Sequence, residues 1–441
     1  MYNILIVDDE PLICKGLSNL LSSAGLDIEN VFTAYSGHEA LDYLRMEDID
    51  LLVTDIQMGV MSGIELMHQA KIIKPWVQTI IISAHETFQY AQLAIRLGAK
   101  DYIIKPIQGD QFLDSVRNVL LKMEKNHLDQ EQLLAKLRQD FHMDEPPPAI
   151  MEVLRRLMND PANFADFALL KERYQIDLSG PYFSVIKVRL DLARDSEGHE
   201  LTDRDRALLR YASLNIINEL LEKEWSHCAF YSADREISII IQWNENNFQE
   251  QGGSKINHLD MIGRSVHHNI SRYLGVSCVV GISQILKGRE FLGVLNEQAR
   301  KAIDWNREHN DHNVFYYGDF NLRLYADDPT SEELSAQNNT IVREAKEYID
   351  RNYMQKGLTL QEVAQKKHVS PNYLSYLFKK YTGYNVWEYV IKQRMEESKR
   401  LLMNTDLRRY EIAEKVGYES PEHFSKIFKK YFGVSPSDMK K

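Results

Sequence analysis

Five polar side chains follow buried-looking apolar segments near the start of the chain. In chain order they are Asp8, Asp9, Asp55, Ser83 and Lys105, after the apolar runs 4–7, 51–54, 79–82 and 102–104. Three carboxylates in one crevice repel one another unless a cation lies among them. Oxygen ligands of this kind suit Mg²⁺. With Asp55 as the nucleophile and with Mg²⁺ and Lys105 neutralising charge, the set could accept a phosphoryl group on a carboxylate.

The surrounding elements must bring these residues to one place. The apolar runs are separated by amphipathic segments such as 12–21 and 37–44, and a weaker strand is expected at 29–34. This alternation predicts a doubly wound, five-stranded parallel sheet over residues 1–122, whose strand ends form a ligand crevice. A solvated loop explains each polar residue alone, but five at successive strand ends favour a site. The pair Lys105-Pro106 predicts a cis peptide that aims the lysine inward.

The segments around these residues carry a family resemblance. ILIVDDEP (4–11), LLVTDIQMGVMSGIEL (51–66), IIISAH (80–85) and GAKDYIIKPI (98–107) resemble the receiver domain of two-component response regulators. The resemblance implies a phosphoacceptor, a magnesium site that includes it, and a phosphate-sensing switch. The implied phosphoacceptor is Asp55. The implied magnesium ligands are Asp8, Asp9, Asp55 and the backbone carbonyl of Gln57, and the implied phosphate-sensing residues are Ser83, Tyr102 and Lys105. Gly59 and Ser62 depart from the usual proline and aspartate, which puts the rigidity of their loop in question.

The charge of the chain is divided unevenly. Residues 341–441 contain 20 Lys and Arg against 13 Asp and Glu, a net of +7. The whole chain has 53 basic and 64 acidic residues, which leaves 33 and 51 in residues 1–340, a net of −18. A basic C-terminal domain on an acidic body suggests a polyanionic partner, although a solvated basic surface would give the same balance.

An internal repeat distinguishes these alternatives. SPNYLSYLFKKYTGYN begins at Ser370 and SPEHFSKIFKKYFGVS begins at Ser420, and a short amphipathic segment precedes each copy. In both copies a serine is placed to cap a helix that starts at proline, and a glycine, Gly383 or Gly433, ends it. The repeat therefore predicts two helix-turn-helix units in an all-helical domain, 341–441. The long helix 386–403 would hold the two units rigidly apart, and if their reading helices lie about 34 Å apart they can enter successive major grooves.

Exposed polar residues of each second helix are the candidates for DNA contact. Base contacts are expected from Asn372, Ser375, Tyr376, Glu422, His423 and Lys426, and phosphate contacts from Lys379, Lys380, Lys429 and Lys430. Asparagine suits adenine, lysine suits guanine and glutamate accepts from cytosine, whereas an ordinary surface is the alternative for each position. The segments 363–390 and 412–437 resemble the AraC/XylS-type DNA-binding domain, which implies double-stranded DNA as partner.

The middle of the chain is less specific. Apolar runs at 182–190, 237–243 and 276–282 predict a second α/β domain over 150–320, which resembles a degenerate nucleotide-cyclase-type palm. Its hairpin at 232–236 lacks the paired glycines that active GGDEF-type cyclases carry, so a sensory or dimerisation role is favoured. A connector helix is expected at 112–145, either packed on its own domain or forming a coiled coil with a second subunit. A polar linker is expected at 326–340.

Together these features predict a cytoplasmic transcription regulator that is not an enzyme. The chain has 44% hydrophobic and 27% charged residues, a balance that excludes extended disorder, and no apolar run is long enough to insert in a membrane. The implied partners are a sensor histidine kinase and DNA, with a homodimer through the receiver or connector helix and contact with RNA polymerase left open. Two alternatives remain: a phosphorylation-independent regulator that senses a ligand, and a nucleotide-signalling enzyme.

Overall fold

The computed structural model describes residues 1–84, 98–123, 148–159, 164–193, 201–222, 225–250, 255–307, 311–320, 331–367 and 369–440. The part of the expected connector helix beyond residue 123 and the start of the expected linker lie outside these residues. Two compact units emerge from the internal contacts: 1–124, 337–367 and 374–441 form the first, and 125–336 with 368–373 form the second. None of the helices in the described part combines the length and apolar character needed to cross a membrane.

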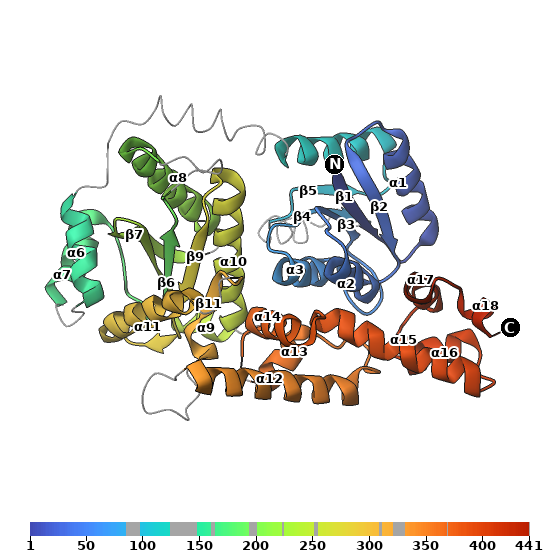
Figure 1. Cartoon of the computed structure of the whole chain (residues 1–441). Helices are drawn as coiled ribbons and strands as arrows, with labels where there is room; N and C mark the ends of the chain where they lie inside the picture. Colours follow the sequence, from blue (N-terminus) through green and yellow to red (C-terminus); the bar gives the residue numbers. More distant parts are fainter. Residues whose placement is uncertain are drawn as a thin grey trace. The chain divides into compact units, whose positions relative to one another are not determined.

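The N-terminal part of the first unit is built on five parallel strands in the order β2-β1-β3-β4-β5 (Figure 1). The elements are β1 (Tyr2–Val7), α1 (Pro11–Ser23), β2 (Ile28–Ala34), α2 (Gly37–Met46), β3 (Leu51–Asp55), α3 (Gly63–Ile73), β4 (Gln78–Ser83) and β5 (Asp101–Ile104). Residues 109–123 are also helical. The doubly wound parallel sheet predicted from the sequence is confirmed.

Both faces of this sheet are covered, which explains its nearly continuous apolar strands. On β1, Ile4 and Ile6 pack in one core with residues of α1 and of the helix at 109–123. Leu5 and Val7 point to the other face and pack with residues of α2 and α3. Because successive strand residues face opposite sides, a parallel strand buried on both faces needs apolar side chains at every position.

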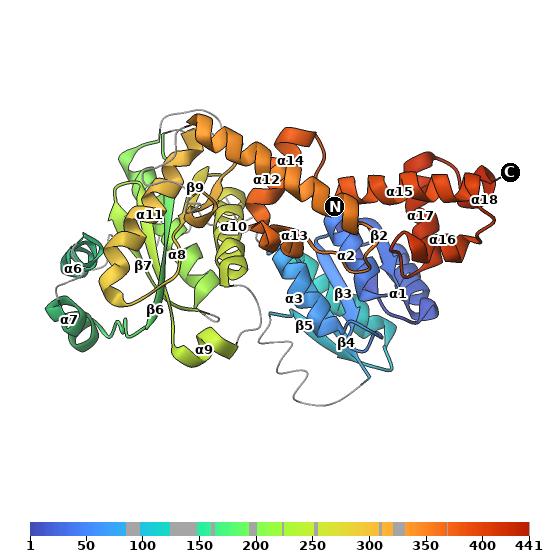
Figure 2. The same ribbon diagram turned by 90° about the horizontal axis from the view of Figure 1, so that it is seen from below.

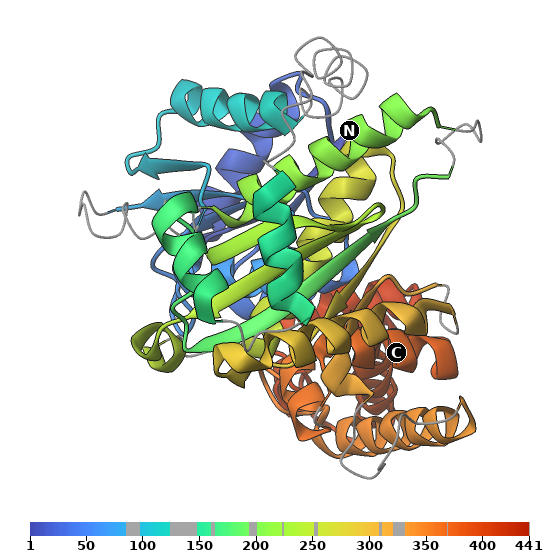
Figure 3. The same cartoon turned by 90° about the vertical axis from the view of Figure 1, so that its left-hand side faces the viewer.

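The second unit holds a mixed sheet in the order β11-β9-β6-β8-β7, with β10 paired to β6 (Figure 3). Its strands are β6 (Tyr182–Leu190), β7 (Ser226–Ala233), β8 (Glu236–Trp243), β9 (Cys278–Ile282), β10 (Leu286–Lys287) and β11 (Val314–Tyr316). Its helices are α6 (Pro148–Asn159), α7 (Phe164–Tyr174), α8 (Asp203–Leu221), α9 (Glu245–Glu250), α10 (Lys255–Leu274) and α11 (Leu292–Asp304), with 3₁₀ turns η1 (Arg289–Phe291), η2 (Trp305–Arg307) and η3 (Tyr317–Asp319). The expected α/β character of this region is confirmed.

The C-terminal part is helical throughout the described residues (Figure 2). Its helices are α12 (Ser331–Asn352), α13 (Leu360–Lys366), α14 (Pro371–Thr382), α15 (Val386–Asn404), α16 (Arg409–Lys415), α17 (Pro421–Phe432) and α18 (Pro436–Met439). Residues 331–340 were expected to belong to a polar linker, but they form the first half of α12. The helix begins before residue 341 because Gln337 and Asn338 are buried on the same side as Ile341 and Ala345. Since these two buried residues are polar, the composition of the segment did not indicate a buried helix face.

Candidate functional sites

The three acidic residues predicted for the metal site meet at the carboxyl edge of the parallel sheet. Asp8 follows β1, and Asp55 is the last residue of β3; they are 1% and 6% exposed, respectively, whereas Asp9 is exposed. Ligand oxygens of all three lie within 4.8 Å of one another. The neighbouring strands β1 and β3 are paired in parallel, so their ends bring residues 47 positions apart to one place.

Lys105 enters this cluster from the end of β5. Its Nζ donates to Asp55 Oδ2 at 2.7 Å and to Asp8 Oδ2 at 3.0 Å. Burial lowers the pKa of Lys105, but its bonds to the two carboxylates outweigh this and raise the pKa overall. The Lys105-Pro106 peptide is cis, as predicted. The ammonium group therefore remains charged, bridging the expected phosphoacceptor and one expected metal ligand.

The remaining predicted residues of the site lie on adjacent strand ends. Ser83, the last residue of β4, is buried at 1% exposure, and its carbonyl accepts from the backbone N–H of Lys105 at 2.8 Å. Tyr102 in β5 is half-buried and packs on the small core formed by Ile56, Met67 and Ile81. Gln57 is exposed in the loop after β3. Strand pairing thus places serine, lysine and carboxylates along one edge.

The loop after Asp55 accounts for both departures from the receiver pattern. Gly59 has a φ of +54°, which proline cannot adopt because its ring fixes φ near −65°. Ser62 replaces the aspartate as the N-cap of α3, and its hydroxyl accepts from the backbone N–H of Glu65 at 3.2 Å. Since serine and aspartate cap helices about equally well, this substitution preserves the start of α3.

The donor set fits a magnesium ion. Three carboxylates within 4.8 Å of one another supply oxygen ligands only, and Lys105 neutralises only part of their charge. A small divalent cation that prefers oxygen and keeps several waters matches this combination of two buried carboxylates and one exposed carboxylate. Within the described residues this is the only grouping of acidic, histidine or cysteine side chains close enough to hold a metal.

The two C-terminal repeats form the predicted capped helices. Ser370 Oγ accepts from the N–H of Tyr373 at 3.2 Å, and Ser420 Oγ accepts from the N–H of His423 at 3.1 Å. Gly383 and Gly433 each have a φ of +78°, the left-handed conformation that ends a helix and that glycine adopts without strain. Each second helix is held by buried residues at matching positions: Leu374, Leu377, Phe378, Phe424, Ile427 and Phe428.

The residues predicted to contact DNA differ in exposure. The four lysines predicted for phosphates are exposed, as are Glu422 and Lys426, whereas Ser375 and Tyr376 are half-buried. Lys380 Nζ donates to Tyr376 Oη at 2.8 Å, and Glu422 pairs with Arg409 at 3.6 Å. In the second unit, Asn372 Nδ2 lies 3.3 Å from the carbonyl oxygen of Val314.

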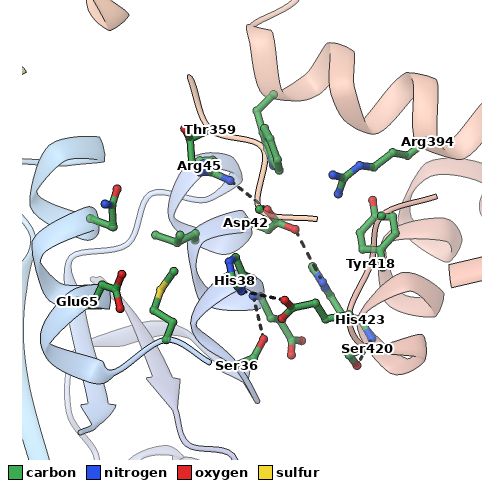
Figure 4. A pocket seen from close by; sticks show the side chains of 18 residues that line it. Ser36, His38, Asp42, Arg45, Glu65, Thr359, Arg394, Tyr418, Ser420 and His423 are labelled. Carbon is green, nitrogen blue, oxygen red and sulfur yellow. Dashed lines mark hydrogen bonds and ion pairs between the residues drawn. The ribbon is translucent and has the colours of Figure 1, made fainter. Parts of the chain in front are cut away.

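His423 departs from the expected exposed position. It is only 3% exposed, and Tyr418 and Tyr43 lie beside its ring with centroids 5.4 and 5.9 Å away. Burial lowers the pKa of His423, which favours the neutral imidazole. The sequence predicted that His423 lies on the side of α17 that faces away from the core of its own domain. It did not predict that a second surface, shown in Figure 4, covers this side.

Other residues received no role from the sequence. Glu39 and Glu47, in and next to α2, face the lysines Lys426 and Lys430, and Asp42 lies 3.9 Å from His423. The excess of acid in residues 1–340 was the only signal for these three carboxylates. Asp319 is buried and accepts from Ser370 N–H and Oγ–H at 2.5 and 2.7 Å. A single acidic residue in a loop has neither periodicity nor a motif.

Comparisons with known proteins agree with the domains predicted for the two ends of the chain. Residues 4–117 match the response regulator receiver domain family, and residues 363–441 match a helix-turn-helix domain family. The uncharacterized transcriptional regulatory protein YesN of Bacillus subtilis is 24% identical over 461 residues, covering 100% of this chain and 98% of that protein. The transcriptional regulatory protein ZraR of Salmonella typhimurium is 36% identical over 118 residues, 27% of this chain and 26% of that protein.

Solved structures include a relative of the C-terminal end. The C-terminal domain of AraT, a response regulator from Geobacillus stearothermophilus, is 44% identical and covers 23% of this chain and 83% of that one, with a TM-score of 0.23. From the family matches and YesN, the chain carries an N-terminal receiver domain and a C-terminal AraC-type helix-turn-helix domain, and it is similar to transcriptional regulators.

Proposed function

We propose that the protein is a phosphorylation-controlled transcription regulator of a two-component system. It accepts a phosphoryl group on Asp55 from a sensor histidine kinase and binds promoter DNA through two helix-turn-helix units. The observation that supports this most directly is the position of Lys105 Nζ, 2.7 Å from Asp55 and 3.0 Å from Asp8, at the strand edge that also holds Asp9. A carboxylate nucleophile beside a fixed ammonium group and further oxygen ligands is the arrangement that phosphoryl transfer to aspartate requires.

In this proposal each residue has a distinct part in the transfer. An oxygen of Asp55 attacks phosphorus, the bond from phosphorus to the histidine nitrogen breaks, and its electron pair stays on the imidazole. Lys105 turns from Asp55 to the phosphoryl oxygens and keeps its charge next to them. Asp8, Asp9, Asp55 and the Gln57 carbonyl would hold Mg²⁺, which would supply further positive charge beside the phosphoryl group. Ser83 and Tyr102, on β4 and β5, sense the new group.

The DNA-binding part of the proposal uses both C-terminal repeats. The predicted phosphate contacts Lys379, Lys380, Lys429 and Lys430 are all exposed at the ends of α14 and α17. Both helices start at a capped proline and end at a left-handed glycine, and α15 joins the two units as one continuous helix. Two reading helices on a stiff connection let one chain contact successive major grooves.

The middle domain, which we compare with a degenerate cyclase palm, is proposed as a sensory or dimerisation module. Cations from neighbouring elements reach its hairpin: Lys187 Nζ on β6 lies 3.1 Å from Glu236 and 3.3 Å from Ser232 Oγ, and Arg210 on α8 pairs with Asp234 at 3.3 Å. The protein's own cations thus neutralise the carboxylates that a metal-dependent cyclase would offer to metal ions. The boundaries 1–122, 150–320 and 341–441, a cytoplasmic location, a homodimer through the receiver or connector helix and contact with RNA polymerase belong to the same proposal.

Phosphotransfer combined with footprinting tests the function. Wild-type protein incubated with labelled acetyl phosphate and Mg²⁺ should incorporate one phosphoryl group, whereas D55N should incorporate none. D114N is the matched control because Asp114 is an exposed aspartate on the same domain, and it should be labelled normally. Genome-wide footprinting should show promoter sites in wild type whose occupancy changes in D55A. An unlabelled wild type, equal labelling of D55N, or identical footprints would contradict the proposal.

A further inference from the structure

Within the first compact unit, acidic residues in and next to α2 lie close to lysines of α17, and Figure 4 shows Asp42 of α2 facing His423 of α17. We call the surface formed by Glu39, Asp42 and Glu47 the acidic face. Lys426 Nζ lies 3.6 Å from Glu39 Oε1, and Lys430 Nζ forms an ion pair with Glu47 Oε1. Burial lowers the pKa of Lys426, but Tyr43, Glu39 and Tyr35 beside it raise the pKa overall, so this lysine is charged.

Histidines contribute to the same contact from both sides. His423 Nδ1 lies 3.9 Å from Asp42 Oδ2, and its ring packs 5.9 Å from the ring of Tyr43. His38 Nδ1 lies 3.0 Å from Glu419 Oε1 just before α17. Each end of the contact therefore pairs an imidazole with a carboxylate, and the aromatic packing removes His423 from water.

The connecting helix of the DNA-binding domain takes part as well. The guanidinium group of Arg45 lies over the ring of Trp387 on α15, 4.2 Å from its centroid. A cavity of about 240 Å³ lies between these groups and is lined by His38, Asp42, Arg45, Trp387, Arg394 and His423, among others. The contact thus involves α15 and α17 together, which orients the second helix-turn-helix unit as a whole.

The side chains that α17 uses here are those predicted to contact DNA. His423 and Lys426 are expected to read bases, and Lys430 is expected to contact phosphate. We infer that the acidic face and DNA compete for the same side of α17, so that the contact with α2 holds the second helix-turn-helix unit away from DNA. The carboxylates offer α17 the negative charge that phosphates would otherwise provide. This inference rests on the proposed function and adds the surface through which it is regulated.

A packed route joins the phosphoacceptor to the acidic face. A Cβ atom at Gly63 would collide with the backbone carbonyl of Asp55, so the loop after β3 closes directly on the acceptor residue. In the same loop, Met61 packs on the first residue of α2, and its Sδ would lie 2.6 Å from a Cβ at Gly37. A phosphoryl group on Asp55 needs space next to this loop, and a shift there moves the start of α2.

The test removes two of the three carboxylates of the acidic face without changing any residue expected to contact DNA. The variant E39Q/E47Q in the full chain loses the carboxylates that pair with Lys426 and Lys430. The control E29Q/D110N makes the same change in net charge at exposed receiver positions outside α2. The probe is a duplex selected by wild-type protein from a random-sequence pool, and its dissociation constant is measured for the unphosphorylated proteins at fixed salt.

We expect the unphosphorylated E39Q/E47Q protein to bind this duplex about tenfold more tightly than wild type and the control, the effect of losing two ion pairs. Hydrogen exchange of residues 37–47 should be slow in free wild type, and faster when DNA or acetyl phosphate is added. Equal affinities for variant and wild type, with α2 protection unchanged by DNA, would overturn the competition while leaving DNA binding intact. If wild type selects no duplex, the proposed function fails instead.

Discussion

Replacing Lys105 with methionine should destabilise the receiver domain, because it leaves the negative charges of Asp8 and Asp55 without a cation beside them. The lysine Nζ lies 2.7 Å from Asp55 and 3.0 Å from Asp8, whose side chains are only 8% and 2% exposed. At an effective dielectric constant of about 20, each contact has a gross attraction of about 6 kcal/mol. Much of this offsets the loss of hydration on burial, and removal of one partner from a buried pair costs about 3–5 kcal/mol.

We take the lower end of that range because Lys105 keeps 17% side-chain exposure. A loss of about 3 kcal/mol should lower the melting temperature of a domain this size by about 10 °C. The deficit should be largest without divalent ions. It should shrink on adding Mg²⁺, which restores positive charge among the carboxylates.

Thermal unfolding of K105M measures this loss, with K122M as the control. Lys122 is exposed in the helix at 109–123, so its replacement should change the melting temperature little. The melts are recorded at one pH, with and without Mg²⁺. A K105M protein that melts at the wild-type temperature without Mg²⁺, or whose deficit is the same with and without Mg²⁺, would refute the charge-balance argument.

Two further predictions concern the second unit. Burial raises the pKa of Asp319 from 3.8 to about 7, so the folded form holds a proton that the unfolded form releases between these values. The contribution of Asp319 to the free energy of unfolding should therefore be greatest below pH 4 and should fall by up to about 4 kcal/mol as the pH rises to 7. Thermal melts of the D319N variant should lack this pH dependence. A Cβ at Gly281 would collide with the carbonyl of Ala299, so the G281A variant should lose about 2–3 kcal/mol of unfolding free energy. The control is G16A on α1, where a Cβ meets nothing within 4 Å and no loss is expected. Urea unfolding compares the two variants, and equal midpoints would contradict the packing argument.

The receiver site could be predicted because its signals are local. An apolar run followed by Asp55 indicates both a buried strand and the residue at its carboxyl end, and parallel pairing then brings distant strand ends together. The bond from Lys105 to Asp8 depends on the orientation of the lysine side chain, which spacing does not specify. For the same reason the sequence identified Gly59 as a departure but did not predict its left-handed backbone.

Packing between distant segments was less predictable. His267 on α10 has its Nδ1 2.9 Å from the carbonyl oxygen of Cys278, and burial lowers the pKa of its ring, a contact that no local sequence pattern indicates. The three-residue strand β11 was missed because Val314–Tyr316 is too short to show a period. His423 was placed correctly on the outer side of its helix, but its burial depends on α2, more than 370 positions earlier in the chain.

The chemistry of the contact between α2 and α17 suits a reversible switch. Its ion pairs lie partly in solvent, since Lys426 and Lys430 keep 43% and 61% side-chain exposure, and such pairs contribute about 1 kcal/mol or less each. Within the described residues, Glu39 Oε1 has its 3.6 Å ion pair with Lys426 but no hydrogen bond, and His423 Nε2 is buried without a hydrogen-bond partner, which weakens the contact further. To move an equilibrium from 1:99 to 99:1, a signal must supply about 5.5 kcal/mol. One phosphoryl group and DNA acting together can release a contact that consists of a few weak ion pairs and contains buried polar atoms with unmade hydrogen bonds, whereas they could not release a fully apolar interface.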